Sequence, residues 1–200
     1  MIVSEKPYSD VAEVYTRGSN TGGVTASAAA LLGADLVVVA LAWDHPPSEG
    51  GIITITFLMM ISFVAFINVL HQIMRSEYLV SRMKLKGTEK KIVEQDTREL
   101  QQISKWARHL HVTGLVFTMI AFWLISYKYL MSPEVVPEGA YNAAILLLPF
   151  ILFILYWIPK LIGVEREVSI LSRGYLIQLI TQVVFLVLIC LDFFRIIKIP

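Results

Sequence analysis

Apolar residues in this chain gather in long blocks that are separated by polar segments, unlike the short stripes of soluble domains. Five of these blocks approach the roughly 20 apolar residues that an α-helix needs to cross the hydrocarbon core of a bilayer. They run from about Val24 to Trp43, Ile52 to Ile73, His111 to Leu130, Tyr141 to Ile158 and Gly174 to Leu191. The pattern predicts an all-α, polytopic integral membrane protein with about five transmembrane helices.

Composition supports this class, because 56% of the 200 residues are hydrophobic and the mean hydropathy is +0.66. Closed β-barrels also cross membranes, but these apolar blocks are too long for barrel strands. The formal net charge of +1 provides no strong field for nucleic acid, so no nucleic-acid partner is expected. The single cysteine, Cys190, excludes a disulfide framework and a cysteine zinc site within one chain.

Charge along the chain predicts four segments. They are a cytoplasmic N-terminal tail over 1–23, a transmembrane hairpin over 24–74, a cytoplasmic helical segment over 75–110 and a three-span transmembrane bundle over 111–200. Nine lysines and arginines fall in 75–108, whereas the loops DHPPSEGG and MSPEVVPEGA hold none. Cytoplasmic loops are enriched in these residues, so the N-terminus and the middle segment are placed in the cytoplasm. Arg195 and Lys198 disagree with this orientation, which turns the C-terminus outward.

The middle segment has the pattern of an amphipathic helix. Lys86-Gly87-Thr88 is typical of a break followed by an N-cap, and one apolar stripe then continues into the third block. The stripe consists of Val93, Leu100, Ile103, Ala107 and Leu110, with Asp96 as an interruption. Two interpretations stay open: the stripe packs against its own chain, or it docks a partner or a second copy.

Asp35 stands in the middle of the first block, which is also rich in alanine. An ionised carboxylate at the centre of a bilayer costs about 2.5–3.5 kcal/mol, so it should face protein or water, or carry a proton. Small residues beside it favour close helix packing: Ala26, Ala30, Gly33 and Ala34. The fifth block offers polar partners, namely Gln178, Thr181 and Gln182. Asp35 is interpreted either as an interhelical hydrogen-bond clamp or, with Gln178 and Gln182, as an ion- or proton-handling site. If the block does not span, four spans remain and the N-terminus changes side.

Three histidines are predicted to lie at one membrane depth: His71 at the end of the second block, with His109 and His111 at the start of the third. Two helices that present histidines at one level can ligate haem or a metal. The stretch LHVTGLVF resembles the helix start LHRxSG of succinate dehydrogenase cytochrome b subunits over fewer than ten residues and lacks its arginine. The alternative interpretation is that these histidines are polar caps at span ends.

Aromatic residues near the block ends predict interfacial belts. Trp43, Trp123 and Tyr127 belong to the predicted outer belt, and Trp106 and Trp157 to the inner one. Asp192 and Arg195, three residues apart after the fifth block, predict a local ion pair.

The chain contains no catalytic or nucleotide-binding motif, so no catalytic residue is predicted. The leading hypothesis is a non-catalytic, accessory or structural subunit of a larger membrane complex. A small homo-oligomeric ion or proton channel or transporter that uses Asp35 is the alternative. A haem-binding electron-transfer subunit is the second alternative. No cofactor is expected for the leading hypothesis, and haem belongs only to this second alternative. The expected partners are the lipid bilayer and other membrane subunits or copies of the chain.

Overall fold

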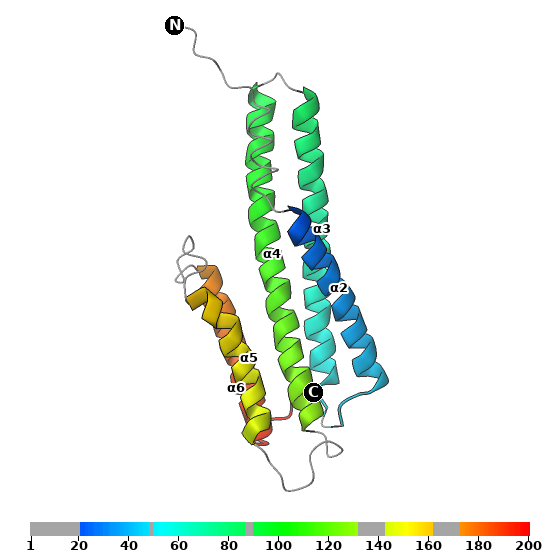
Figure 1. Ribbon diagram of the computed structural model, residues 1–200, viewed down its shortest axis with the longest axis vertical. Coiled ribbons are helices and arrows are strands. Elements are labelled where there is room, and N and C mark those ends of the chain that lie inside the picture. Colours follow the sequence, from blue (N-terminus) through cyan, green and yellow to red (C-terminus); the bar gives the residue numbers. More distant parts are fainter. Residues whose placement is uncertain (1–20, 49, 87–89, 132–142, 162–172) are drawn as a thin grey trace. The chain divides into compact units, whose positions relative to one another are not determined.

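The computed structural model describes residues 21–48, 50–86, 90–131, 143–161 and 173–200 (Figure 1). This part of the chain consists of five helices without strands, as predicted: α2 (Thr21–Asp44), α3 (Ile52–Lys86), α4 (Lys90–Leu130), α5 (Ala143–Leu161) and α6 (Arg173–Phe193). The predicted N-terminal tail up to residue 20, the break and N-cap at 87–89 and the start of the fourth block at Tyr141 lie outside the described residues.

Four helices are long and apolar enough to cross a membrane, which fits an integral membrane protein. Their apolar segments are Gly23–Asp44, Ile52–Met83, Gln95–Leu130 and Leu176–Phe193. The fourth predicted span corresponds to α5, whose apolar stretch Ile145–Ile158 is shorter. The structure therefore bears out four of the five predicted spans by length and composition, and the first block, with its aspartate, is one of them.

The predicted middle segment is not a separate helix but a continuation of two long ones. Helix α3 has 35 residues and α4 has 41. At 1.5 Å per residue they extend about 50 and 60 Å, well beyond a hydrocarbon core of about 30 Å. Helix α4 enters the third block without a break, as the apolar stripe predicts. The cytoplasmic location of this segment stays a prediction.

The chain divides into two compact units. Unit 1 comprises Met1–Gly33 and Val64–Val112, and unit 2 comprises Ala34–Phe63 and Thr113–Pro200. Helices α2, α3 and α4 each contribute residues to both units.

In unit 1, α3 and α4 pack through the apolar stripe that the sequence predicts. Leu100 and Ile103 of α4 form a buried cluster with Leu79 of α3, and Val80 and Met83 pack against it. These contacts favour the first interpretation, in which the stripe covers its own chain. The side chain of Val93 lies outside the described part.

Asp96, the interruption in the stripe, is explained by an ion pair. Its side chain is 1% exposed, and its Oδ1 accepts a hydrogen bond from Nη2 of Arg82 at 2.7 Å. A second pair, Arg75 with Glu99 at 2.5 Å, joins the same two helices at a more exposed position. The charge at Asp96 is therefore tolerated in an apolar seam because the facing helix supplies its counter-ion.

This pair predicts an asymmetric mutational effect. Arg82→Leu leaves a buried carboxylate unpaired and should destabilise unit 1 by about 3–5 kcal/mol. Asp96→Leu should cost less, because the side chain of Arg82 is 35% exposed and can turn to water. The double variant should recover most of the loss, since leucines continue the stripe. Amide hydrogen exchange over residues 76–86 and 95–104 measures these changes, and equal losses in both single variants would contradict the assignment.

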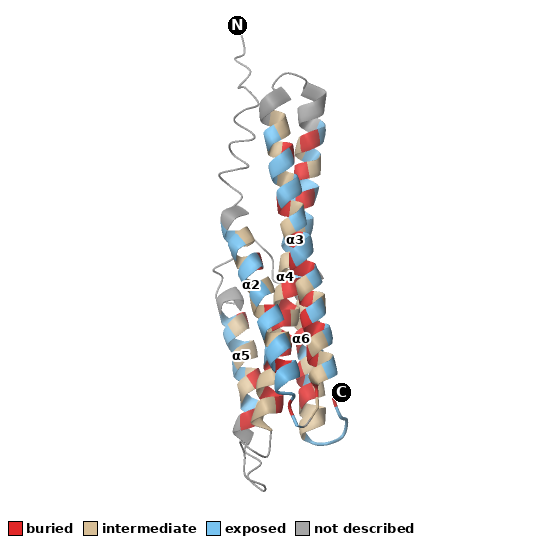
Figure 2. Cartoon of the chain, turned by 90° about the vertical axis from the view of Figure 1, so that its right-hand side faces the viewer, coloured by how far each residue is buried: buried red, intermediate tan, exposed pale blue. Residues whose placement is uncertain are grey.

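In unit 2, several polar side chains are buried and many large apolar side chains are exposed, which is the reverse of a soluble domain. Its buried polar residues are Asp35, Ser62, Thr118, Lys128 and Gln182, while large apolar side chains such as Val37, Phe57, Ile151 and Ile177 are exposed. Figure 2 shows that most of α2 and α5 is exposed or intermediate. Such an apolar exterior fits a lipid environment, in which polar groups turn towards other helices.

The residues of the predicted aromatic belts differ in exposure. Trp43 and Trp106 are 60% and 64% exposed, which is compatible with a belt, and their level in a membrane stays a prediction. Trp123 and Tyr127 are fully buried and Trp157 is 6% exposed, so the belt assignment is wrong for these three. They pack inside unit 2, where the ring of Phe153 lies edge-on to Trp123 at a centroid distance of 6.0 Å.

Candidate functional site

Asp35 lies in unit 2 at a point where residues of three helices share hydrogen bonds. The hydroxyl of Thr118 on α4 donates to Oδ1 of Asp35 on α2 at 3.2 Å. The hydroxyl of Ser62 on α3 lies 2.6 Å from that of Thr118, and both reach the Gly114 carbonyl, at 3.0 and 3.1 Å. Asp35 is 1% exposed and Ser62 is fully buried. We call these four residues the Asp35 cluster.

The hydrogen atoms of the Asp35 cluster do not suffice for its acceptors. The only side-chain donors in the cluster are the hydroxyl hydrogens of Ser62 and Thr118. The acceptors are the two hydroxyl oxygens, the Gly114 carbonyl and the carboxyl group of Asp35. Oδ2 of Asp35 is buried and has no hydrogen-bond partner among the described residues. The contact of 3.2 Å is also longer than the 2.5–2.7 Å of a hydroxyl bonded to a carboxylate. A proton on Asp35 would supply the missing donor.

The glutamines that the sequence offers as partners have other contacts. Gln182 is fully buried and accepts a hydrogen bond at its Oε1 from Nε1 of Trp157 on α5, at 2.6 Å. The hydroxyl of Thr181 donates to the Ile177 carbonyl of its own helix. Oε1 of Gln178 and Nε2 of Gln182 are buried and have no partner among the described residues. No hydrogen bond between the described residues joins Asp35 to either glutamine, and an ion-handling role for the three stays a prediction.

The small-residue face of α2 is largely exposed among the described residues. Ala26, Ala30 and Gly33 are exposed and Ala34 is intermediate. A Cβ atom at Gly33 would meet no atom of the described residues within 4 Å. The helix instead buries Ala28, Asp35 and Ala42, which are seven residues apart. Packing of the small-residue face against a further helix stays a prediction.

The three histidines lie in unit 1 and differ in their surroundings. His71 and His109 are exposed. His111 is half-buried, and its ring meets that of Phe66 edge to face at a centroid distance of 5.7 Å. The buried Nδ1 of His111 has no hydrogen-bond partner in the described part of the chain. Haem or metal ligation by these residues stays a prediction.

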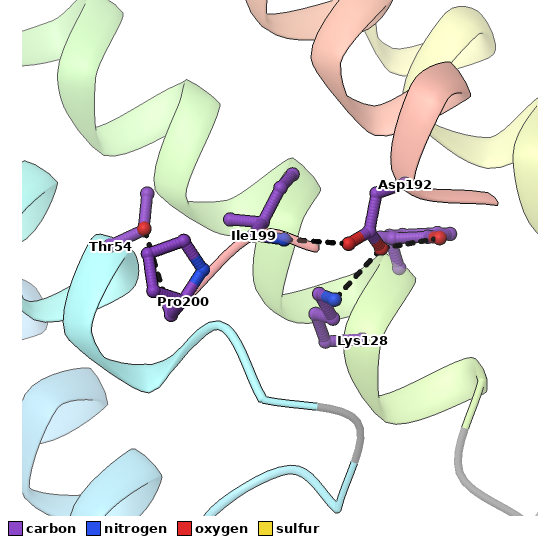
Figure 3. A network of polar contacts seen from close by, with 6 residues as sticks. Thr54, Lys128, Asp192, Ile199 and Pro200 are labelled. Carbon is purple, nitrogen blue, oxygen red and sulfur yellow. Dashed lines mark hydrogen bonds and ion pairs between the residues drawn. The ribbon is translucent and has the colours of Figure 1, made fainter. Parts of the chain in front are cut away.

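A second polar site, the Asp192 network, lies where α4 and α6 end (Figure 3). Oδ2 of Asp192 accepts hydrogen bonds from Nζ of Lys128 and from the hydroxyl of Tyr127, both at 2.8 Å. Oδ1 accepts the backbone N–H of Ile199 at 2.8 Å. The side chains of Lys128 and Asp192 are only 2% and 7% exposed. The carboxylate that the sequence pairs with Arg195 is thus held by three other donors.

The chain after α6 returns to the start of α3. Helix α6 ends in a Schellman motif, in which Ile196 N–H donates to the Leu191 carbonyl and Arg195 N–H to the Asp192 carbonyl. The segment then runs to Pro200, whose carbonyl oxygen accepts the N–H and the hydroxyl of Thr54 at 3.0 and 2.9 Å (Figure 3). Thr54 lies in the first turn of α3, so Pro200 satisfies a donor that the helix itself leaves unpaired.

The turn before α3 needs glycine for two reasons. Gly50 and Gly51 have φ angles of +81° and +94°, a region that L side chains rarely adopt. A Cβ atom at Gly51 would also lie 3.1 Å from Cγ of Lys128. The bare backbone of Gly51 therefore lets the Lys128 side chain lie against the turn and reach Asp192.

Several residues of the two sites are not singled out by the sequence pattern. Lys128 carries a detectable signal, because a charge inside an apolar block is rare and costly. Ser62 and Thr118 carry none, since single hydroxyl residues are common in transmembrane helices and bond to their own backbone. The contact of Ile199 with Asp192 depends on how the chain turns after α6.

The chemistry available to these sites is hydrogen bonding, ion pairing and proton exchange. Among the described residues, no group of three or more histidine, cysteine, aspartate or glutamate side chains is placed to hold a metal ion. Comparisons of the chain with protein-family models, with curated proteins and with solved structures find no match.

The buried ion pair predicts strong coupling between Lys128 and Asp192. Lys128→Met leaves a carboxylate buried without its counter-ion, and we expect a loss of about 3–5 kcal/mol in unfolding free energy. Asp192→Asn should lose a similar amount, and the double variant less than the sum of the two. Reversible unfolding of the detergent-solubilised protein measures this double-mutant cycle. Additive losses would mean that the two side chains do not act as a pair.

Proposed function

We propose that this protein is a non-catalytic, structural or accessory subunit of a larger membrane complex. The observation that carries the proposal is the Asp35 cluster, in which one buried carboxyl group joins side chains of three helices. The Trp157–Gln182 bond likewise joins α5 to α6. Polar groups that contact one another across helices hold a scaffold together, because lipid offers no competing partner.

The open face of α2 supports association with a further helix. It combines small side chains, exposure and an apolar exterior, which are the features of helix–helix interfaces in membranes. A subunit or a second copy of the chain would bury this face. We also propose that the N-terminus and the segment 75–110 lie in the cytoplasm.

Proton or cation handling at Asp35 is the second candidate function. It is favoured by one observation, the buried Oδ2 without a partner among the described residues. A carboxyl oxygen of this kind can bind and release a proton if water or an ion reaches it. The two candidates differ in what Asp35 must do: a clamp needs only a hydrogen bond, whereas a titrating site needs the acid.

The two functions are separated by two substitutions at Asp35. As a clamp, Asp35→Asn should preserve assembly, because the amide can donate to the hydroxyl of Thr118 as a protonated acid would. Asp35→Leu should impair assembly and lower stability by about 1–3 kcal/mol, since it leaves the Thr118 hydroxyl without this partner. The measurement is the native mass and polypeptide composition of the gently solubilised protein, with ion flux in proteoliposomes.

Asp44→Asn on the same helix is the matched control, because the side chain of Asp44 is 74% exposed. A flux that Asp35→Asn abolishes while the assembly stays intact would contradict the subunit function and establish the transport function. A purified protein that stays a single monomeric chain would contradict both the complex and the oligomer.

A further inference from the structure

The Asp35 cluster brings side-chain oxygen atoms together from α2, α3 and α4, all within unit 2. The hydroxyl oxygens of Ser62 and Thr118 lie 2.6 Å apart, and that of Thr118 lies 3.2 Å from Oδ1 of Asp35. The ion pairs in the described part of the chain join other side chains. The carboxyl group of Asp35 is therefore buried among neutral oxygen atoms and has no cationic side chain as a partner in that part.

A proton on Asp35 leaves one part of the carboxyl group unsatisfied. On Oδ1, the proton serves the contact with Thr118, and Oδ2 stays without a partner among the described residues. On Oδ2, the proton finds no described acceptor to which it can donate. A buried polar atom without a partner is costly, so protonation alone does not satisfy the cluster. A cation that contacts both carboxyl oxygens satisfies Oδ2 as well.

The two hydroxyl groups can direct their hydrogens away from such a cation. Each lies within hydrogen-bond distance of the Gly114 carbonyl, Ser62 at 3.0 Å and Thr118 at 3.1 Å. When both donate to this carbonyl, their oxygen lone pairs stay available together with the carboxyl oxygens of Asp35. Two hydroxyl and two carboxyl oxygens are the kind of ligand set that hard cations prefer.

The charge of the cluster favours a monovalent cation. One carboxylate neutralises one positive charge, whereas a divalent ion would leave a net charge buried among apolar helices, which is costly. The short distances between the oxygen atoms favour sodium over the larger potassium ion, because the size of a site and the number of its ligands determine which ion it selects. The protein oxygens would replace the water shell of the ion.

We infer that the Asp35 cluster binds one sodium ion, with the carboxylate of Asp35 and the hydroxyl oxygens of Ser62 and Thr118 as ligands. This inference rests on the second candidate function, proton or cation handling at Asp35, and names the ion. The bound ion joins α2, α3 and α4, so it also strengthens the contact between helices that a clamp provides. An ion held without water fits a residue that is only 1% exposed.

The test measures the unfolding equilibrium of the full-length protein in neutral detergent, by urea titration followed by circular dichroism. Sodium chloride or potassium chloride replaces choline chloride at constant ionic strength. An ion that binds only the folded state lowers the unfolding equilibrium constant. This effect depends on equilibrium alone, so it is detected even when a buried ion exchanges slowly.

Two variants remove ligands, and each has a matched control on the same helix. Asp35→Asn removes the charge and is compared with Asp44→Asn, since the side chain of Asp44 is 74% exposed. Ser62→Ala removes one hydroxyl and is compared with Ser76→Ala. The hydroxyl of Ser76 donates to the Ile73 carbonyl of its own helix and lies outside the cluster.

Above its dissociation constant, sodium should lower the unfolding equilibrium constant of the wild type about tenfold for each tenfold rise in concentration, as one bound ion requires. Potassium should have a weaker effect. Asp35→Asn should abolish the dependence on sodium, and Ser62→Ala should shift it to higher sodium concentrations because one ligand is lost. Asp44→Asn and Ser76→Ala should keep the dependence of the wild type.

A dependence on sodium that persists in Asp35→Asn, or potassium that acts as strongly as sodium, would overturn the inference. A stability that responds to pH through Asp35 but not to sodium would also overturn it, and would leave proton handling as the second candidate function. A stability that Asp35 makes dependent on neither would overturn the inference and remove that candidate as well. The native mass of the solubilised protein tests the subunit function separately.

Discussion

Polar side chains on apolar helices must find their partners inside the protein, and this constraint organises unit 2. Lipid offers neither donors nor acceptors, so a carboxyl, amide or ammonium group is stable there only against another helix. Asp35 meets Thr118, Gln182 meets Trp157 and Lys128 meets Asp192. Each contact determines which helices pack together, and the apolar blocks alone do not determine this pairing.

The same constraint separates what the sequence could predict from what it could not. Blocks of apolar residues predict helices and class, because the length of a span is set by the bilayer. The stripe with Leu100 and Ile103 predicts the seam with α3, since the seam follows from helical periodicity. The small-residue face at Ala30 and Gly33 does not predict the buried face of α2, because small residues fit a close contact without requiring one.

The candidate sites show where such prediction stops. A buried aspartate can be located from one sequence, but its partner depends on helix rotation and depth, which no local pattern fixes. In the sequence, Gln178 and Gln182 are plausible partners of Asp35. In the structure, the hydrogen bond of Asp35 is instead with Thr118. The Asp192 network is further from prediction, because Ile199 and Pro200 reach it only through the left-handed residue Arg195. Within this network, Lys128 is detectable in the sequence because it is a charge inside an apolar block.

Water access to Asp35 is the most direct test of the claim that buried polar groups act as clamps between helices. Asp35→Cys in a Cys190→Ser background can be exposed to a charged, water-soluble thiol reagent in sealed proteoliposomes, from each side in turn. Asp44→Cys is the reactive reference, since Asp44 lies in an exposed position. The account predicts rapid labelling of Asp44→Cys and none of Asp35→Cys. Labelling of Asp35→Cys at a comparable rate in a folded protein would place the cluster on an aqueous pathway and contradict the account.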